Sequence, residues 1–259
     1  MDKTSKMTHK PETVLITGAT GDFGKAFCKR FESMGCRLLL WGRSGDKLRA
    51  LQEELKTETY AVACDMRDME AIKTAWQSIP EKWNDVDLLI NNAGGAHGQE
   101  PAYESCAEDW EEMIDVNVKA LAVLTNCVLP GMASREKGHI INIGSVAGVY
   151  PYPGGHAYCG VKAFVKQFSL SLRADLIGKN VRVTDIEPGM VETRFSLVRF
   201  KGDRQKADAV YAGTTPLQAE DVAGCVAWAA TLPEHVNINV IEVMPTTQGP
   251  GPLAVKRFS

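Results

Sequence analysis

The sequence has few of the features that would assign the protein to a specialised structural class. Of its 259 residues 44% are hydrophobic and only 7% aromatic, and no apolar run approaches the roughly 18 residues of a membrane span. Basic and acidic side chains nearly balance, with 29 Lys and Arg against 32 Asp and Glu. This balance argues against nucleic acid or an anionic membrane as the main partner. We therefore expect a cytoplasmic protein that acts on small soluble molecules.

Neither the cysteines nor the histidines follow a disulfide or metal-binding pattern. The seven cysteines are scattered, odd in number and form no CxxC pair, so we expect buried, reduced thiols. The five histidines lack HExxH or any other paired-ligand spacing. We expect no bound metal.

The apolar segments indicate one domain of the α/β class. Short apolar runs alternate with helical patterns, and their near-continuous apolar character is typical of parallel strands covered by helices on both faces. The expected strands are residues 13–17, 37–41, 59–63, 86–91, 138–143, 181–186 and 238–243. Gly35 and Gly178 are expected to end helices. The pattern predicts a Rossmann-like, doubly wound, seven-stranded parallel sheet over residues 12–249, with a flexible leader at residues 1–11 and a C-terminal tail at residues 250–259.

A glycine-rich turn follows the first expected strand, in the segment TVLITGATGDFGKAF. A strand that leads through glycines into a helix places backbone N–H groups and the positive helix end where a pyrophosphate can sit. Gly18 and Gly24 suit a tight turn and close helix packing. Asp22 puts a carboxylate near this site, and we expect it to cap the helix N-terminus, with Gly21 available for any strained backbone angle.

The end of the second expected strand indicates which dinucleotide would bind. An acid there would hydrogen-bond the ribose 2′-hydroxyl of NAD, whereas an arginine accommodates the 2′-phosphate of NADP. The strand is followed by Arg43 and Ser44, with no acid until Asp46. Arg43 can fork onto a phosphate. The alternative is a surface arginine on an exposed turn, but the placement favours NADP(H).

Tyr158 and Lys162 have the spacing YxxxK and follow Ser145, which ends the segment GHIINIGS. Helix positions i and i+4 share a face, so the phenol and the ammonium can reach the same ligand. Lowering a tyrosine pKa from about 10 to near neutrality asks for about 4 kcal/mol, which one positive charge at about 4 Å supplies at an effective dielectric of about 20. We therefore expect Lys162 to tune Tyr158 nearly unaided. The NNAG segment at residues 91–94 and Asn117 in a helical stretch add to this constellation.

Together these segments resemble the short-chain dehydrogenase/reductase family. TGATGDFG matches its TGxxxGxG loop, NNAG its motif after the fourth strand, Ser145 with Tyr158 and Lys162 its active site, and PGMVET its PG-containing cofactor loop. The match spans essentially residues 12–248. Asp22 departs from the family pattern, because it stands where the middle glycine is usual.

The resemblance implies roles for individual residues. Tyr158 would pass a proton to or from the substrate oxygen, Ser145 would hydrogen-bond that oxygen, and Lys162 would lower the tyrosine pKa and hold the nicotinamide ribose. Asn117 would bind a water that links Lys162 to solvent. Asp65 and Thr193, among the cofactor contacts, could instead only cap or begin a helix. The implied cofactor contacts are Gly18, Thr20, Asp22, Phe23, Gly24, Arg43, Ser44, Asp65, Met66, Asn91, Ala93, Gly94, Tyr158, Lys162, Pro188, Gly189, Val191 and Thr193.

A finer resemblance concerns the substrate. The segments GHIINIGSVAG, RVTDIEPGMVET and VRFKGD are similar to the NADP-dependent 3-hydroxy acid dehydrogenase subgroup, whose members oxidise serine, allo-threonine and related acids or reduce malonic semialdehyde. Such substrates carry an anionic end, and we assign Arg199 to it because a guanidinium can grip a carboxylate or sulfonate with two parallel hydrogen bonds. Tyr152 and Gln248 are further candidates as pocket wall and polar contact. The alternative for Arg199 is a surface ion pair with Asp203 or Glu192.

Two other functions stay open. The chain could be a sulfoacetaldehyde reductase that forms isethionate, because those enzymes are similar too, or a non-catalytic NADP-sensing regulator. The intact set of Ser145, Tyr158 and Lys162 argues against the regulator. Family members are commonly tetramers, so the resemblance implies a homotetramer whose substrate is a small anionic hydroxy acid or aldehyde.

Overall fold

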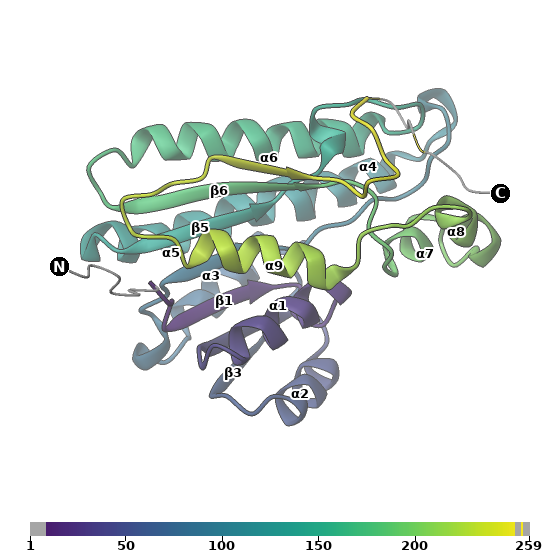
Figure 1. The fold of residues 1–259 in the computed structure, drawn as a ribbon. Coiled ribbons are helices and arrows are strands. Elements are labelled where there is room, and N and C mark those ends of the chain that lie inside the picture. The colour runs from purple at the N-terminus through teal and green to yellow at the C-terminus, as the bar shows by residue number, and fades with distance from the viewer. Residues whose placement is uncertain (1–8, 252–254, 256–259) are drawn as a thin grey trace.

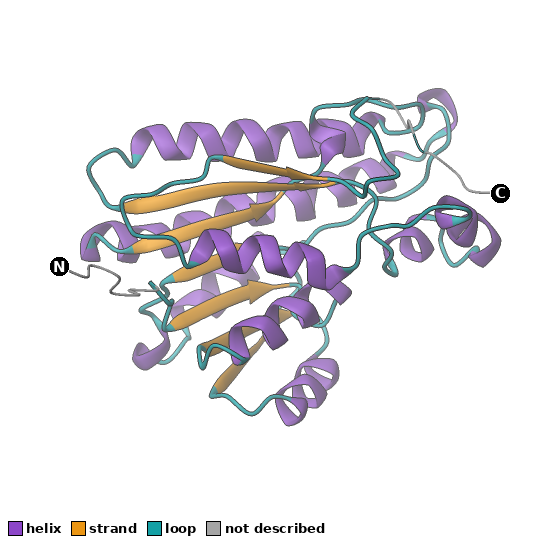
Figure 2. Ribbon diagram, viewed as in Figure 1, coloured by secondary structure: helices purple, strands orange, loops and turns teal. Residues whose placement is uncertain are grey.

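The structure, a computed structural model, describes residues 9–251 and Val255. A seven-stranded parallel sheet runs through it in the order β3-β2-β1-β4-β5-β6-β7, with helices on both faces (Figures 1 and 2). The strands are β1 Thr13–Thr17, β2 Arg37–Gly42, β3 Thr59–Ala63, β4 Leu88–Asn91, β5 Gly138–Ile143, β6 Val181–Pro188 and β7 Val240–Val243. The predicted doubly wound fold is confirmed. Most of the expected leader and tail lies outside the described residues.

Burial along the strands follows their place in the sheet. All residues of β1, β4 and β6 are buried, as the continuous apolar runs predicted, because neighbours and helices cover them on every side. The edge strands β3 and β7 are only partly buried. The acidic residues of β6 are therefore enclosed although they interrupt its apolar pattern.

The helices divide between the two faces of the sheet. Side chains of α1, α2 and α9 pack into one apolar cluster, and those of α3 and α5, with residues flanking α6, into another. Left-handed glycines follow two of them, Gly35 at φ +70° after α1 and Gly178 at φ +82° after α6, as expected of helix stops. The α-helices are α1 Asp22–Glu32, α2 Gly45–Glu54, α3 Met69–Gln77, α4 Ala107–Ile114, α5 Leu121–Arg135, α6 His156–Asp175, α7 Phe195–Arg199, α8 Arg204–Tyr211 and α9 Ala219–Ala230.

One π-helical stretch, Asp115–Ala120, joins α4 and α5 into a continuous helix from Ala107 to Arg135. Its length and its mean hydropathy of 1.4 would suffice to cross a membrane. Its apolar residues are nonetheless those of a core helix, since Leu124 and Val128 pack in the same cluster as Leu89 of β4. Packing against the sheet accounts for the buried share of its apolar window, which is 39%.

The cysteines are all free. Cys28, Cys36 and Cys64 are buried, as predicted, and burial raises the pKa of the Cys28 thiol to about 12. Cys106, just before α4, is exposed, so the prediction of buried thiols is wrong there, and Cys127, Cys159 and Cys225 are only partly buried.

A buried polar layer connects the central strands to the helices above them. The Asn91 amide donates to Thr125 Oγ1 on α5 at 2.9 Å and to Asn142 Oδ1 on β5 at 2.8 Å. The Asn142 amide in turn donates to Ser169 Oγ on α6 at 2.8 Å. Because buried polar groups are costly when unpaired, this layer favours one register of α5 and α6 against the sheet.

Gly24 is the position in α1 at which a side chain is least tolerable. A Cβ there would lie 2.2 Å from the Gly18 carbonyl oxygen and 2.7 Å from Ala19 backbone atoms. We expect Gly24→Ala to lower the free energy of unfolding by about 2 kcal/mol or more, measured by urea denaturation. Gly224→Ala is the control: nothing lies within 4 Å of its Cβ, so it should be neutral or stabilising. Equal stability of the two variants would contradict this close packing.

Candidate active site

The carboxyl ends of the parallel strands bring the candidate residues to one edge of the sheet. The nucleotide turn follows β1, Arg43 follows β2, Asp65 follows β3, and Ser145 follows β5. Figure 1 shows α7 and α8 beyond the same edge, after β6. Ligands of open α/β sheets bind in the crevice at this edge.

The turn after β1 is shaped by glycine. Gly18 adopts φ +64°, and a Cβ on it would lie 3.2 Å from the Ala93 backbone. Gly21 is the N-cap of α1 in extended backbone at φ −78°, so the expectation that it takes the strained angle is wrong. With no cap side chain, the first N–H groups of α1 are left for an anion. The turn therefore fits a pyrophosphate.

Asp22 differs from its expected role. It is the first residue of α1 rather than its cap, and its carboxylate accepts hydrogen bonds from Arg194 N at 2.7 Å and Arg194 Nε at 2.8 Å. Arg194 also reaches the Thr20 carbonyl oxygen at 3.4 Å. Arg194 thus neutralises the charge of Asp22. The ion pair also connects the segment after β6 to the nucleotide turn.

The residues after β2 and β3 form a polar group at one end of the edge. Arg43 is exposed, and its charge helps to lower the pKa of Asp65. The largest cause of that lowering is the hydrogen bond from Arg67, whose Nη2 lies 2.6 Å from Asp65 Oδ2. Ser44 caps α2, and Asp68 caps α3, so the alternative that Asp65 serves as that cap is wrong. An exposed guanidinium remains available here for a phosphate.

The NNAG segment contributes backbone rather than side chains. Asn91 is buried, and its side-chain nitrogen donates to Thr125 and Asn142 in the polar layer. Ala93 N donates to Thr17 Oγ1 at 2.8 Å. A Cβ on Gly94 would lie 2.5 Å from Asn117 Oδ1 and 3.7 Å from Lys162 Nζ, so this glycine brings the segment against two candidate side chains.

Gln248 supports the PG loop after β6 through a hydrogen bond. Its Oε1 accepts from Met190 N at 2.7 Å and would lie 2.4 Å from a Cβ on Gly189. Gln248 thus supports the loop through this oxygen, and its expected contact with substrate stays a prediction. Val191 pairs with Leu217, and Thr193 Oγ1 accepts from Phe195 N at 3.2 Å where α7 begins.

Ser145, Tyr158 and Lys162 lie together. Ser145 is a hydrogen-bond partner of Tyr158 and caps the short turn after β5, where it accepts from Ala147 N at 3.1 Å. Lys162 Nζ lies 5.7 Å from the centre of the Tyr158 ring and donates to the Ile143 carbonyl oxygen at 2.8 Å. The β5 carbonyl thus holds the ammonium beside the phenol.

The charges around Tyr158 differ from the sequence expectation. Burial raises the pKa of Tyr158 well above its ordinary value of 10, and the groups that oppose this rise are Ser145, through its hydrogen bond, and the cation of Arg199. Burial also lowers the pKa of Lys162 to about 8, against the charge of Asp185. The prediction that Lys162 tunes Tyr158 nearly unaided is therefore wrong for the protein by itself, because desolvation dominates and the groups that lower the pKa of Tyr158 are Ser145 and Arg199.

Asn117 lies in the π-helical stretch between α4 and α5. Its amide donates to Met113 O at 2.9 Å and to Gly95 O at 3.0 Å. Single π turns inside helices are frequent at functional sites, because they turn a side chain out of the regular pattern. Here the turn directs Asn117 toward the NNAG segment and the neighbourhood of Lys162.

Arg199, at the end of α7, is buried beside Tyr158. Its Nε donates to Gly98 O at 2.9 Å and its Nη1 to Tyr152 Oη at 2.8 Å. The guanidinium carbon lies 5.2 Å from the centre of the Tyr152 ring and 5.9 Å from that of Tyr158. The sequence prediction that grouped Tyr152 with Arg199 corresponds to this direct contact.

The acids proposed as alternative partners of Arg199 are engaged elsewhere. Asp203 caps α8 and forms an ion pair with Lys206, and Glu192 lies 3.4 Å from the Gln218 amide. The alternative of a surface ion pair is therefore wrong. The hydrogen-bond acceptors of Arg199 among the described residues are neutral oxygens, so no acid there pairs with this residue, which is only 9% exposed.

Sequence reasoning missed three neighbours of the site. Gly98 N donates to the Arg199 carbonyl oxygen, and Gly98 O accepts from Arg199 Nε. Gly98 adopts φ +67°, which its glycine identity in GGAHG could have suggested. Phe195 lies 5.6 Å from Tyr158, ring centre to ring centre. Its position and the pairing of Arg194 with Asp22 depend on how α7 folds over the edge, and no sequence spacing gives this.

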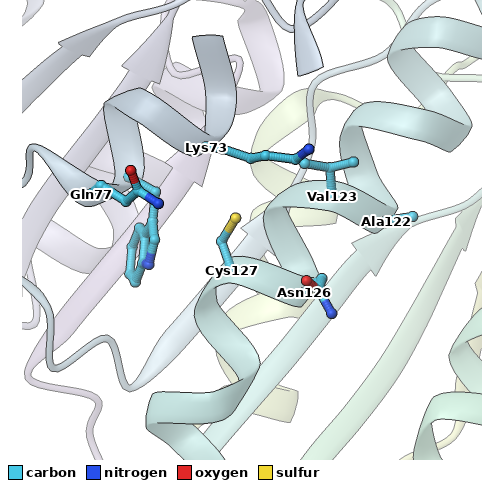
Figure 3. Close-up of a pocket in the computed structure, with 7 residues that line it drawn as sticks. Lys73, Gln77, Ala122, Val123, Asn126 and Cys127 are labelled. Atoms are coloured by element: carbon cyan, nitrogen blue, oxygen red, sulfur yellow. The ribbon is translucent and has the colours of Figure 1, made fainter. Parts of the chain in front are cut away.

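A surface pocket of about 430 Å³ lies between α3 and α5, apart from these residues (Figure 3). It is lined by Lys73, Trp76, Gln77, Ala122, Val123, Asn126 and Cys127. None of the candidate catalytic or cofactor residues is among them, so this pocket plays no part in the site.

Known proteins match the chain over nearly its whole length. The family model of short chain dehydrogenases covers residues 12–203. The chain is 52% identical to NADP-dependent 3-hydroxy acid dehydrogenase YdfG of Salmonella typhi, covering 94% of this chain and 99% of the relative. It is 48% identical to sulfoacetaldehyde reductase 2 of Chromohalobacter salexigens, covering 95% and 99%.

A solved structure agrees with these sequence matches. The closed form of a serine dehydrogenase complexed with NADP+ superposes with a TM-score of 0.90 at 51% identity, covering 95% of this chain and 100% of that one. The glycine turn, the Ser145, Tyr158 and Lys162 group and these matches lead to one conclusion: the chain belongs to the short-chain dehydrogenase family.

Proposed function

We propose that the protein interconverts a short 3-hydroxy acid, of the serine, allo-threonine or 3-hydroxypropionate type, and its oxo or semialdehyde form with NADP(H). The observation that carries this proposal is the buried Arg199 guanidinium, which has no acidic partner among the described residues and lies 5.9 Å from the centre of the Tyr158 ring. Membership of the family accounts for the oxidation and reduction of a hydroxyl carbon, and Arg199 determines which of the family's substrates bind.

A buried cation without an acid is unfavourable in the protein alone, because desolvation is not repaid by a neighbouring negative charge. Arg199 Nη2 has only a long contact of 3.5 Å with Gly154 O, so it has hydrogen-bonding capacity left. A substrate carboxylate would accept from this side and complete the charge pair. Its carbon chain would then extend toward Tyr158, as a hydroxyl two carbons from the carboxylate requires.

The residues around Tyr158 support proton transfer at the substrate oxygen. Tyr158 would take the hydroxyl proton in oxidation and return it in reduction, while Ser145 hydrogen-bonds that oxygen. Lys162 would stabilise the phenolate, and Asn117 would hold a water that relays the proton to solvent. A bound nicotinamide would accept or supply the hydride. Arg199 would fix the substrate so that its reacting carbon faces that ring.

Several features support NADP(H) as the cofactor. The glycine turn admits a pyrophosphate, and the exposed Arg43 can meet a 2′-phosphate at the end of β2. The relatives described above include an NADP-dependent dehydrogenase and a structure with NADP+ bound. Val191 and Thr193 would meet the carboxamide.

A second candidate function is the reduction of sulfoacetaldehyde to isethionate. Two oxygens of a sulfonate can accept hydrogen bonds from one guanidinium, as the two oxygens of a carboxylate do. A relative of 48% identity is named sulfoacetaldehyde reductase 2. A non-catalytic NADP sensor is less well supported, because Ser145, Tyr158 and Lys162 are all in place.

We also propose a cytoplasmic homotetramer. Phe164 and Phe168 stack on α6 with ring centres 5.5 Å apart, and Phe164 is 37% exposed, which suits a face that packs on another subunit. The partly exposed edge strand β7 offers unpaired backbone groups for a similar contact. The free cysteines suit a reducing compartment.

Tyr158→Phe tests the catalytic assignment. We expect kcat to fall at least about 100-fold, because the proton donor is removed, while NADPH affinity measured by fluorescence titration stays close to that of the wild type. Tyr150→Phe, on a residue whose hydroxyl lies 3.5 Å from Glu242 instead, serves as the control. A Tyr158→Phe enzyme with most of its rate would remove Tyr158 from this role.

Arg199→Ala tests the anion clamp. We expect kcat/KM for malonic semialdehyde to fall about 100-fold, or about 3 kcal/mol, and that for the uncharged propanal to fall much less. Arg199→Lys keeps a charge but loses the fork, and should give an intermediate loss. Equal losses on the charged and the neutral aldehyde would disprove the clamp.

Substitutions of Asp22 and Arg194 test whether their ion pair favours cofactor binding at the nucleotide turn. Arg194→Ala leaves the Asp22 carboxylate unpaired near the phosphates, so we expect NADPH to bind about fivefold more weakly at low salt, with a smaller effect at high salt. The double variant with Asp22→Gly should recover most of the affinity. An Arg194→Ala protein with unchanged affinity at low ionic strength would show that the pair does not act on the cofactor.

A further inference from the structure

The segment after β6, residues 189–194, leads from the sheet to α7 and is bound at two places. At its inner part Val191 pairs with Leu217 and is 9% exposed. At its outer end Arg194 binds Asp22, and the Arg194 side chain is 58% exposed. We call residues 189–194 the strap. Its outer end is the part that can separate from the rest of the protein at the lower cost, because less surface is buried there.

Three hydrogen bonds join the outer end of the strap to the nucleotide turn. The Asp22 carboxylate accepts from Arg194 N at 2.7 Å and from Arg194 Nε at 2.8 Å, and Arg194 Nη2 lies 3.4 Å from the Thr20 carbonyl oxygen. Both acceptors belong to the turn and the first residue of α1, where free N–H groups suit a pyrophosphate. The strap is therefore bound to the phosphate site itself.

Two consecutive residues connect this phosphate site with the catalytic tyrosine. Arg194 binds Asp22, and the ring centre of Phe195 lies 5.6 Å from that of Tyr158. A dinucleotide with its pyrophosphate at the turn and its nicotinamide at Tyr158 would connect the same two places. It would therefore lie along the outer end of the strap, and this end would cover its way in and out.

Asp22 has no other role at the start of α1 that would explain it. It stands where the loop pattern of the family has its middle glycine, and the N-cap of α1 is Gly21. Its carboxylate accepts instead from a residue 172 positions further along the chain. A carboxylate beside N–H groups that suit a phosphate would repel that phosphate unless a cation balances it.

Opening of the strap would change the charge that a phosphate meets. While the strap is closed, Arg194 balances the Asp22 carboxylate. When Arg194 moves away, the carboxylate is left unbalanced beside the first N–H groups of α1 and repels a phosphate there. The closed strap therefore binds the cofactor more tightly than the open one, although the cofactor passes through the open one.

We infer that the strap closes over the nucleotide turn by protein contacts alone, and that the Asp22–Arg194 pair must break before NADP(H) can enter or leave. The pair thus controls the rate of cofactor exchange in addition to its effect on affinity. The inference depends on NADP(H) as the cofactor and not on which hydroxy acid or aldehyde the enzyme uses.

A strap that must open slows entry and exit alike. Removing both charges would let the strap open more often and would leave no unbalanced charge at the turn. The association and dissociation rate constants of NADPH would then rise together, and their ratio, the Kd, would change little. An ion pair that only stabilised the bound state would change the dissociation rate constant alone.

Stopped-flow measurement of NADPH fluorescence tests the inference in the full-length protein. For Asp22→Gly/Arg194→Ala we expect both rate constants to rise about fivefold, the effect of losing an exposed ion pair with its hydrogen bonds, and the Kd to stay within about twofold of the wild type. The matched control is Lys25→Ala/Glu54→Ala. It removes an ion pair of 3.7 Å between α1 and α2 that involves no strap residue, and it should leave both rate constants unchanged.

Amide hydrogen exchange of the protein without ligand gives a second measurement. Asp22→Gly leaves the sequence of the strap intact but removes the acceptor of the Arg194 N–H. The peptide that covers residues 192–200 should therefore exchange faster in Asp22→Gly than in the wild type, and the Lys25→Ala/Glu54→Ala control should match the wild type.

Three kinetic results would each overturn the inference: unchanged rate constants in the double variant of Asp22 and Arg194, a rise in dissociation alone, or an equal rise in the control. Unchanged exchange of residues 192–200 in Asp22→Gly would overturn it as well, also if the double variant does not fold. Neither measurement uses a substrate, so failure of the proposed 3-hydroxy acid activity leaves both results standing.

Discussion

Parallel pairing of the strands is the constraint on which the site depends. Because β1, β4, β5 and β6 run in the same direction, every loop that follows them opens at one edge, and residues distant in sequence meet there. The buried polar layer of Asn91 and Asn142 sets α5 and α6 against these strands. Tyr158 and Lys162 on α6 thereby lie over the end of β5, where Ser145 begins the next turn.

Electrostatics at this edge is dominated by buried charges rather than by surface ion pairs. Arg199 and Lys162 are both cations near the Tyr158 phenol, and each lies 6 Å or less from its ring centre. Arg199 contacts neutral oxygens, and Lys162 contacts a backbone carbonyl. Both charges are therefore stronger than exposed ones would be, and both favour an anion: a substrate carboxylate for one and a phenolate for the other.

The sequence predicted most of the fold because the strands are continuous apolar runs bounded by turn residues. The ranges 13–17, 59–63 and 138–143 correspond residue for residue to β1, β3 and β5. The proximity of Tyr158 and Lys162 was also predictable, since helical spacing places them on one face. The unpredicted features depend on tertiary contacts: Asp22 meets Arg194 only because the segment after β6 folds back over α1. The cost of burying Tyr158 likewise cannot be calculated from spacing alone.

The short helix α7 is fixed at both ends. Arg194, just before it, is bound to Asp22 on the nucleotide turn, and Arg199, its last residue, is bound to Gly98 and Tyr152. Five residues therefore connect the place where a cofactor phosphate would sit to the place where a substrate anion would sit. Because both anchors belong to one short helix, a movement of α7 that breaks one of them also displaces the other.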